Sequence, residues 1–321
     1  MWPPYKLMDR HYLEDAQRKH SRLERLYHVG AEKTWDGRKI LGDLLKKHGS
    51  PRDRVPVEKR QALAEIFSTI LWGELAAWSI SADLALQLES VEAKMAATGQ
   101  VFDEARHFYV MRDYLLELDI DLPPLDGYTH TVLTELLDSK RLIDKLLGMQ
   151  LIVESVAVTL FRTIADAGVE PVLTELMPYF ERDEARHVGL GVLYLPELLS
   201  KLSFAEGMRL RGMQMKIATL IGWGSTLKRK SFETLGIDNH ESFKRGMRLN
   251  QELLAGMRQK DGKVPRGVVV GSEAMDKFNN LAIDLFFPPL GAELPGWHSR
   301  LLGMTDRLSR LGDRALRALS S

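Results

Sequence analysis

The sequence contains no cysteine at any of its 321 positions. This absence excludes disulfide bonds, a cysteine-ligated zinc site, a thiolate-ligated iron–sulfur cluster and a thiol nucleophile. The chain also lacks an uninterrupted apolar run of about 18 residues, so no membrane-spanning helix is expected. Its first residues lead into a charged stretch without the apolar segment of a signal peptide. Together these absences predict a soluble, cytoplasmic protein.

Net charge is also absent, but the charges are unevenly distributed along the chain. Residues 57–200 carry 24 acidic and 11 basic side chains, a net charge of −13. The flanks are basic: residues 1–56 carry 13 basic and 8 acidic side chains, and residues 201–266 carry 14 and 6. Solvated helix faces account for most of such an excess, but bound cations would also neutralise an acidic centre.

The apolar residues recur at three- and four-residue spacing almost throughout, and alternating β-branched runs are nearly absent, which predicts an all-α protein. The run 268–270 is the one strand-like stretch, and no sheet is expected from it. We expect an N-terminal helical extension (1–55), a four-helix bundle (56–200) and a C-terminal helical extension packed on it (201–321). The expected helices are 9–47 with a break near Gly30, 56–88, 90–119, 129–166, 171–195 with a kink or break at Pro178, 203–233, 239–260, 271–286 and 296–319.

An internal repeat is the most informative feature of the sequence. The motif Asp-Glu-Ala-Arg-His occupies residues 103–107 and recurs 80 residues later at 183–187. Another glutamate, Glu74 or Glu154, precedes the glutamate of each motif by 30 residues. About 15 residues up one helix and about 15 down the next return a chain to the same height. The spacing therefore places each early glutamate beside the motif that follows it.

Within each motif the glutamate and the histidine are three residues apart, so both side chains leave one face of the helix. Four carboxylates and two imidazoles would then point into one bundle interior, where unpaired carboxylates are costly. Two divalent ions would compensate them, as in di-iron and di-manganese carboxylate bundles. Solvated helix faces, or a duplication that has lost its metal, are the alternatives. The expected metal ligands, through which any catalysis would proceed, are Glu74, Glu104, His107, Glu154, Glu184 and His187.

Over about residues 60–195 these motifs resemble the ferritin-like di-iron oxygenases and oxidases. That superfamily includes the hydroxylase subunits of bacterial multicomponent monooxygenases, the ribonucleotide reductase small subunit and the arylamine N-oxygenases. The resemblance implies two iron ions, although oxygen and imidazole ligands also accept manganese or a mixed iron–manganese pair. It further implies that Asp103 hydrogen-bonds His187 and that Asp183 hydrogen-bonds His107. Arg106 and Arg186 would pair with these aspartates near the bundle surface, or form ordinary helix-face salt bridges.

Two positions depart from individual members of that superfamily. Met111 occupies the place of the radical tyrosine of the ribonucleotide reductase small subunit, and Tyr109 and Tyr114 lie off that face. Phe180 occupies the place of the third histidine of the arylamine N-oxygenases. The first departure argues against radical storage, and the second makes N-oxygenation the less favoured of the reactions that the resemblance implies.

The function implied by the resemblance is O₂-dependent oxidation of a small, hydrophobic or carrier-bound organic substrate by hydroxylation, N-oxygenation or desaturation. The alternative is a non-catalytic di-metal scaffold or assembly protein. The side chains one turn from the ligands are ordinary core positions or the walls of an apolar substrate pocket. The candidates for that pocket are Trp78, Phe108, Met111, Val158, Phe161 and Phe180.

Oxidation of this kind needs electrons, and the sequence has no flavin or iron–sulfur motif, so a separate ferredoxin or reductase is expected. Basic runs at 228–230 and 244–248 are candidate docking sites for it or for a carrier protein. Aromatics are not interleaved with these runs, so nucleic-acid binding is not expected. The C-terminal helix is amphipathic, with arginines at seven-residue spacing. We expect it to pack on its own chain rather than on a membrane surface, with a homodimer as the alternative.

Overall fold

The computed structural model describes residues 20–257, 267–268 and 273–320, and within these ranges the protein is all-α without a strand. Val268 is not in a strand, and the rest of that strand-like run lies outside the described residues. Three predicted helices extend partly beyond the described ranges, over residues 9–19, 258–260 and 271–272. The predicted fold class is therefore confirmed for the part of the chain that the structure describes.

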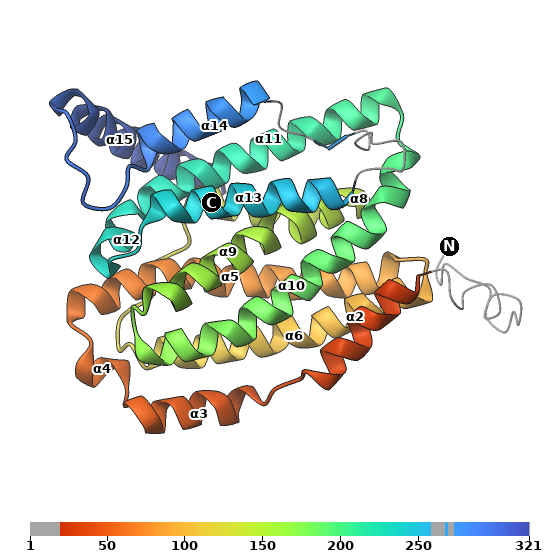
Figure 1. The fold of residues 1–321 in the computed structure, drawn as a ribbon, viewed down its shortest axis with the longest axis horizontal. Helices are drawn as coiled ribbons and strands as arrows, with labels where there is room; N and C mark the ends of the chain where they lie inside the picture. The colour runs from red at the N-terminus through yellow and green to blue at the C-terminus, as the bar shows by residue number, and fades with distance from the viewer. Residues whose placement is uncertain (1–19, 258–266, 269–272, 321) are drawn as a thin grey trace, which may run out of the picture.

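Four long helices form the centre of the molecule (Figure 1). Helix α5 (Val57–Gln87) packs along α6 (Val91–Leu116), α9 (Glu154–Ala167) packs along α10 (Pro171–Ser200), and α6 also contacts α10. The connections between α5 and α6 and between α9 and α10 are short, so the two helices of each pair run antiparallel. The side chain of Ser90 caps the start of α6, and Gly168 ends α9 in the left-handed conformation with φ 59°.

The apolar residues of these helices form two separate clusters. On α5, residues 62–71 belong to one cluster and residues 77–84 to the other. On α6, residues 110–115 belong to the first and residues 93–97 to the second. Glu74 and Glu104 lie between these stretches, in the middle of their helices. The acidic residues of the repeat thus occupy a polar layer between two apolar cores.

The predicted helix 129–166 is wrong in its middle. The structure has α7 (Gly127–Asp138), a break, α8 (Leu142–Lys145), a π-helical segment η1 (Leu146–Val153) and then α9. The polar residues 139–141 interrupt the apolar periodicity, and α7 turns back against α8. At the return, a Cβ on Gly148 would lie 2.2 Å from the Leu136 side chain, so the two segments approach too closely for a larger residue.

One predicted break is absent and another is displaced. Helix α10 continues through Pro178, although a proline cannot donate the backbone hydrogen bond at that position. Helix α2 (Ser21–Glu32) continues through Gly30, and the chain breaks at residues 33–36 before α3 (Gly37–His48). The Asp36 side chain caps α3 by accepting a hydrogen bond from the Lys39 amide at 3.0 Å. This cap explains the position of the break.

The remaining helices flank the four central ones (Figure 1). Helices α2 and α3 contact α6 and α10, and the one-turn α4 (Pro51–Arg54) leads into α5. On the other side, α12 (Arg229–Leu235) contacts α5, α13 (Asn239–Gly256) contacts α9 and α11 (Phe204–Leu227) contacts α7. The C-terminal elements are α11 (Phe204–Leu227), α12 (Arg229–Leu235), α13 (Asn239–Gly256), α14 (Glu273–Phe286) and α15 (Gly296–Ser320).

Two segments, Val57–Gln87 and Leu142–Ala167, are long and apolar enough to cross a membrane by length and composition. Length and composition alone do not make either segment a membrane span, so the expectation that no helix crosses a membrane stays a prediction. In each, 56% of the most apolar window is buried inside the protein, as is usual for the core helices of a globular domain. Both segments carry a buried glutamate of the repeat, which makes this apolar character weak evidence for a membrane span.

Candidate metal centre

The six residues predicted as ligands lie together in two overlapping groups. One group contains Glu74 and His107, the other contains Glu154 and His187, and both include Glu104 and Glu184. Within each group, one potential ligand atom from every residue lies within 4.8 Å of the others. All six side chains are buried. The structure thus forms two adjacent positions that could each hold a metal ion and share two carboxylates.

Each shared carboxylate directs one oxygen toward each histidine. Glu184 Oε1 lies 2.9 Å from Nδ1 of His107, and its Oε2 lies 2.8 Å from Nδ1 of His187. Glu104 Oε1 lies 3.0 Å from Nδ1 of His187, and its Oε2 lies 3.5 Å from Nδ1 of His107. This arrangement suits two carboxylates that bridge two ions, with one terminal histidine on each ion.

Each position also has one carboxylate that is not shared, Glu74 or Glu154, and these two side chains make different contacts. Glu74 Oε2 lies 3.4 Å from Nδ1 of His107. Glu154, which follows the π-helical segment directly, accepts a hydrogen bond from Gln100 instead. Glu104 Oε2 and His107 Nδ1 are buried and lack a well-directed hydrogen bond, although His107 Nδ1 has the carboxylate of Glu184 close to it at 2.9 Å. Buried polar atoms left unpaired are costly, and a cation between them would satisfy both, so the donor set fits a metal pair.

The crossed contacts implied by the resemblance are present. Nε2 of His107 lies 3.3 Å from Asp183 Oδ2, and Nε2 of His187 lies 3.3 Å from Asp103 Oδ2. A carboxylate on Nε2 holds a proton there and leaves Nδ1 free as a ligand atom. The Nδ1 atoms are the ones that face the glutamates, so they are the ring atoms placed to bind a metal ion.

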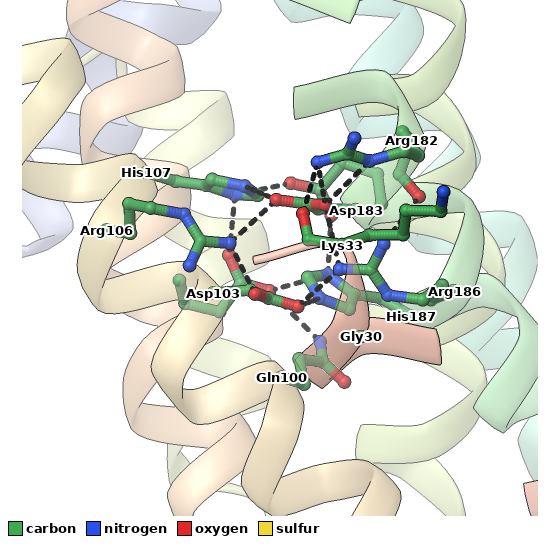
Figure 2. A network of polar contacts seen from close by, with 12 residues as sticks. Gly30, Lys33, Gln100, Asp103, Arg106, His107, Arg182, Asp183, Arg186 and His187 are labelled. Carbon is green, nitrogen blue, oxygen red and sulfur yellow. Dashed lines mark hydrogen bonds and ion pairs between the residues drawn. The ribbon is translucent and has the colours of Figure 1, made fainter. Parts of the chain in front are cut away.

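Arg106 and Arg186 link the two aspartates into a closed ring (Figure 2). Arg106 Nη2 contacts Asp103 and lies 2.7 Å from Asp183 Oδ2, while Arg186 Nη2 lies 2.9 Å from Asp103 Oδ2 and 2.7 Å from Asp183 Oδ1. Arg106 is only 3% exposed, so the expectation that it pairs near the surface is wrong. The ring balances two negative charges with two positive ones beside the six ligands.

The pKa directions show how the site balances its charge when only protons are bound. Burial raises the pKa of Glu74 well above its ordinary value, and for Glu154 the charges of Glu184 and Glu104 add to burial in raising the pKa. Burial also acts to raise the pKa of Glu104 and Glu184, but the adjacent histidines hold the pKa of both below the ordinary range. Burial acts to lower the pKa of both histidines, yet the surrounding carboxylates raise it well above its usual value. Protons thus compensate the carboxylates where divalent ions would otherwise do so.

Two buried glutamines belong to the site and were missed by the sequence prediction. Gln100 Nε2 donates to Glu154 Oε1 at 2.8 Å and to Glu104 Oε1 at 3.1 Å. Gln150 Nε2 donates in turn to Gln100 Oε1 at 3.0 Å. Gln150 comes close to α10 at Gly191, where a Cβ would lie 2.7 Å from Cβ of Gln150. The position of Gln100, four residues before Glu104 on the same helix face, was a signal available in the sequence.

Trp35 is a second contributor that the sequence did not indicate. It lies between α2 and α3, and its Nε1 donates to Asp183 Oδ2 at 2.7 Å. Its ring also lies under the guanidinium of Arg106, with Cζ 4.9 Å from the ring centroid. Trp35 thus ties the N-terminal helices to the aspartate–arginine ring.

The predicted pocket residues do not surround a cavity among those found in the described part of the chain. Met111, Phe161 and Phe180 are fully buried in the core, and the ring of Phe180 stacks on His107 with centroids 4.4 Å apart. Trp78, Phe108 and Val158 are half-buried. A cavity of about 20 Å³ does adjoin the site, bordered by Gly30, Gln100, Asp103, Arg186 and His187 among others. It has room for about one water molecule.

The predicted docking residues in the basic runs are mostly paired within the chain. Lys228 pairs with Asp126, Arg229 with Asp306, Lys244 with Asp284 and Arg245 with Asp166. Lys230 and Arg248 are exposed. The basic character of these runs therefore serves largely to hold the C-terminal helices in place.

Comparison with known proteins gives this chain no family. No family model, no curated protein and no solved structure matches it significantly. The structure itself shows a helical protein with buried carboxylate–histidine groups that could hold metal ions.

Proposed function

We propose that this chain is an O₂-dependent di-iron oxygenase or oxidase built on a ferritin-like four-helix bundle. The observation that supports it most is the shared position of Glu104 and Glu184, each with one oxygen directed at each histidine. Two ions held this closely by two common carboxylates are the arrangement used for two-metal chemistry. The crossed Asp103 and Asp183 add the hydrogen bonds that orient metal-bound histidines.

In this proposal Glu74 and His107 would hold one ion and Glu154 and His187 the other, and Glu104 and Glu184, which belong to both groups, would contribute to both. Iron in such a pair supplies the redox chemistry with O₂, and manganese or a mixed pair fits the same ligands.

The surrounding side chains of the chain have separate roles. Asp103 and Asp183 keep the Nε2 proton on each imidazole. The ring of Phe180, stacked on His107, excludes water from that end of the site. Gln100 holds Glu154 and Glu104 at the other end, beside the small cavity. The substrate class proposed is a small hydrophobic or carrier-bound molecule, because Phe161, Phe180 and Met111 make the site's surroundings apolar.

The proposal is tested by the reaction of the ferrous protein with O₂. Protein loaded anaerobically with Fe(II) should consume O₂ rapidly in a single turnover, and added chemical reductant or reduced ferredoxin should restore its reactivity. The Glu184→Ala variant, which lacks a shared carboxylate, should lose this reaction. A protein that binds about two ferrous ions and stays inert to O₂ contradicts the oxygenase proposal.

A non-catalytic di-metal scaffold is the second candidate, and the dense packing around the site favours it. The three pocket candidates nearest the ligands are fully buried, and the cavity that adjoins the site holds about one water molecule. Stable metal binding without O₂ consumption, together with loss of folding stability on metal removal, would support this scaffold.

A further inference from the structure

The C-terminal helix α15 exposes an apolar stripe that the described part of the chain leaves uncovered. The stripe comprises Trp297, Met304, Leu308, Leu311 and Leu319. Their spacing of seven, four, three and eight residues places them along one face of the helix. Leu308 is 48% exposed, Leu311 60% and Leu319 85%. Single exposed apolar residues are ordinary, but a continuous stripe of this length marks an interaction site.

Helix α15 packs on its own chain, as expected, but through a face rich in small polar residues. Thr305 and Ser309 are buried against the neighbouring helices. The Tyr128 hydroxyl donates to the Ser309 carbonyl oxygen at 3.1 Å, and the Gly127 amide donates to Asp313 Oδ1 at 2.6 Å. These contacts fix the rotation of the helix, so the apolar stripe faces outward.

The charges beside the stripe indicate which kind of partner it fits. Arg300, Arg307 and Arg314 recur every seven residues along one flank of the stripe and are exposed. The only acidic residues of the helix are Asp306 and Asp313. They pair with Arg229 and Arg317 within the chain. A second copy of α15 would therefore bring no free carboxylate to these arginines, whereas an anionic lipid surface would bring many phosphates.

We propose that α15 docks the protein on an anionic membrane surface, with the apolar stripe inserted among the acyl chains and the arginine row on the phosphates. An amphipathic helix with an aromatic at one end and arginines along its polar border is the usual form of such an anchor. The position of α15 at the outer edge of the molecule leaves the helix accessible (Figure 1). This inference does not depend on whether the metal centre is catalytic.

The test is co-sedimentation of the full chain with vesicles. Vesicles of phosphatidylglycerol and phosphatidylcholine in equal parts should bind the protein, and binding should weaken as salt is added. Vesicles of phosphatidylcholine alone should bind it much less. Arg307→Gln and Arg314→Gln should each weaken binding about fivefold. The double variant Leu308→Ser/Leu311→Ser should weaken it about tenfold or more.

A matched control replaces an exposed leucine elsewhere. Leu116→Ser on α6, where the leucine is 67% exposed, should leave vesicle binding unchanged. Circular dichroism and metal content should be the same for all variants, which separates lost docking from lost folding. The proposal is overturned if the anionic vesicles fail to bind the protein or bind the Leu308→Ser/Leu311→Ser variant equally well. It is also overturned if the chain is a dimer without lipid that this double variant converts to a monomer.

Discussion

Gln100 and Phe180 occupy equivalent positions in the two halves of the repeat, four residues before Glu104 and Glu184 respectively. Their side chains nevertheless make opposite environments. Gln100 donates hydrogen bonds to two of the carboxylates, whereas Phe180 stacks on His107 and offers no polar atom. The repeat places the candidate ligands symmetrically. Gln100 and Phe180 give the two candidate metal positions different surroundings, one polar and one apolar.

We predict that the two positions bind metal with different affinities for this reason. The Gln100→Leu variant removes the hydrogen bonds that orient Glu154 and Glu104, so binding of one ion should weaken about 10- to 100-fold. Calorimetric titration of metal-free protein with Co²⁺ or Mn²⁺ measures both affinities.

A control for this variant is Gln61→Leu, which changes an exposed glutamine on α5. It should leave both affinities unchanged. Two equal affinities in the wild type, or an unchanged titration for Gln100→Leu, would refute the asymmetry.

The crossed aspartates should matter for metal affinity without being ligands. Asp103→Asn and Asp183→Asn each remove a carboxylate from the Nε2 side of one histidine, and each should weaken metal binding about 10- to 100-fold. Asp183→Asn should have the larger effect, because Asp183 also accepts the hydrogen bond of Trp35. Trp35→Phe keeps the aromatic packing and should weaken binding less than Asp183→Asn does. Equal affinities for all three variants and the wild type would contradict these roles.

Metal loading should release protons. Burial raises the pKa of Glu74 and Glu154, and the surrounding carboxylates raise the pKa of both histidines, so these groups hold their protons to higher pH than free side chains do and divalent ions must displace them. Metal affinity should therefore fall as the pH decreases from about 8 to about 6. Calorimetry in buffers of different ionisation enthalpy counts the released protons. An affinity independent of pH would show that the groups are already deprotonated.

The packing of α15 against α7 of the same chain depends on a close contact at Gly312. A Cβ there would lie 2.0 Å from the Tyr128 hydroxyl oxygen, which is held by Ser309. Gly312→Ala should lower the free energy of unfolding by about 1–3 kcal/mol through overpacking. Gly303→Ala, on the same helix but with open space around it, should raise that free energy by up to about 1 kcal/mol. Urea denaturation of both variants measures the difference, and equal effects would exclude the contact.

The sequence located the six candidate ligands because their spacing is a local property of paired helices. Thirty residues from Glu74 to Glu104 fix the register of one helix pair, and the repeat applies the same register to the other. Trp35 could not be found this way, because it lies 148 residues from Asp183 on a segment outside the repeat. The role of Trp35 depends on how α2 and α3 pack on the central helices, and the spacing of apolar residues does not predict that packing.

The fold was predictable in class but not in detail. The helix expected at 129–166 is interrupted at residues 139–141, and the close approach of Gly148 to Leu136 that accompanies the break is a tertiary contact that periodicity does not predict. The orientation of α15 could not be predicted either. The apolar face of an amphipathic helix is usually the buried one, which would bury Leu308 and Leu311. Specific polar contacts at Ser309 and Asp313 bury the opposite face instead.

The central claim is the pair of metal positions with shared carboxylates, and metal stoichiometry tests it most directly. After anaerobic loading with Fe(II) and removal of free metal, the wild type should retain about two ions per chain. Glu74→Ala should retain about one, since it removes a ligand from one position only, whereas Glu104→Ala should lose most of both. Fewer than about one ion per wild-type chain, or undiminished binding by Glu104→Ala, would contradict the account.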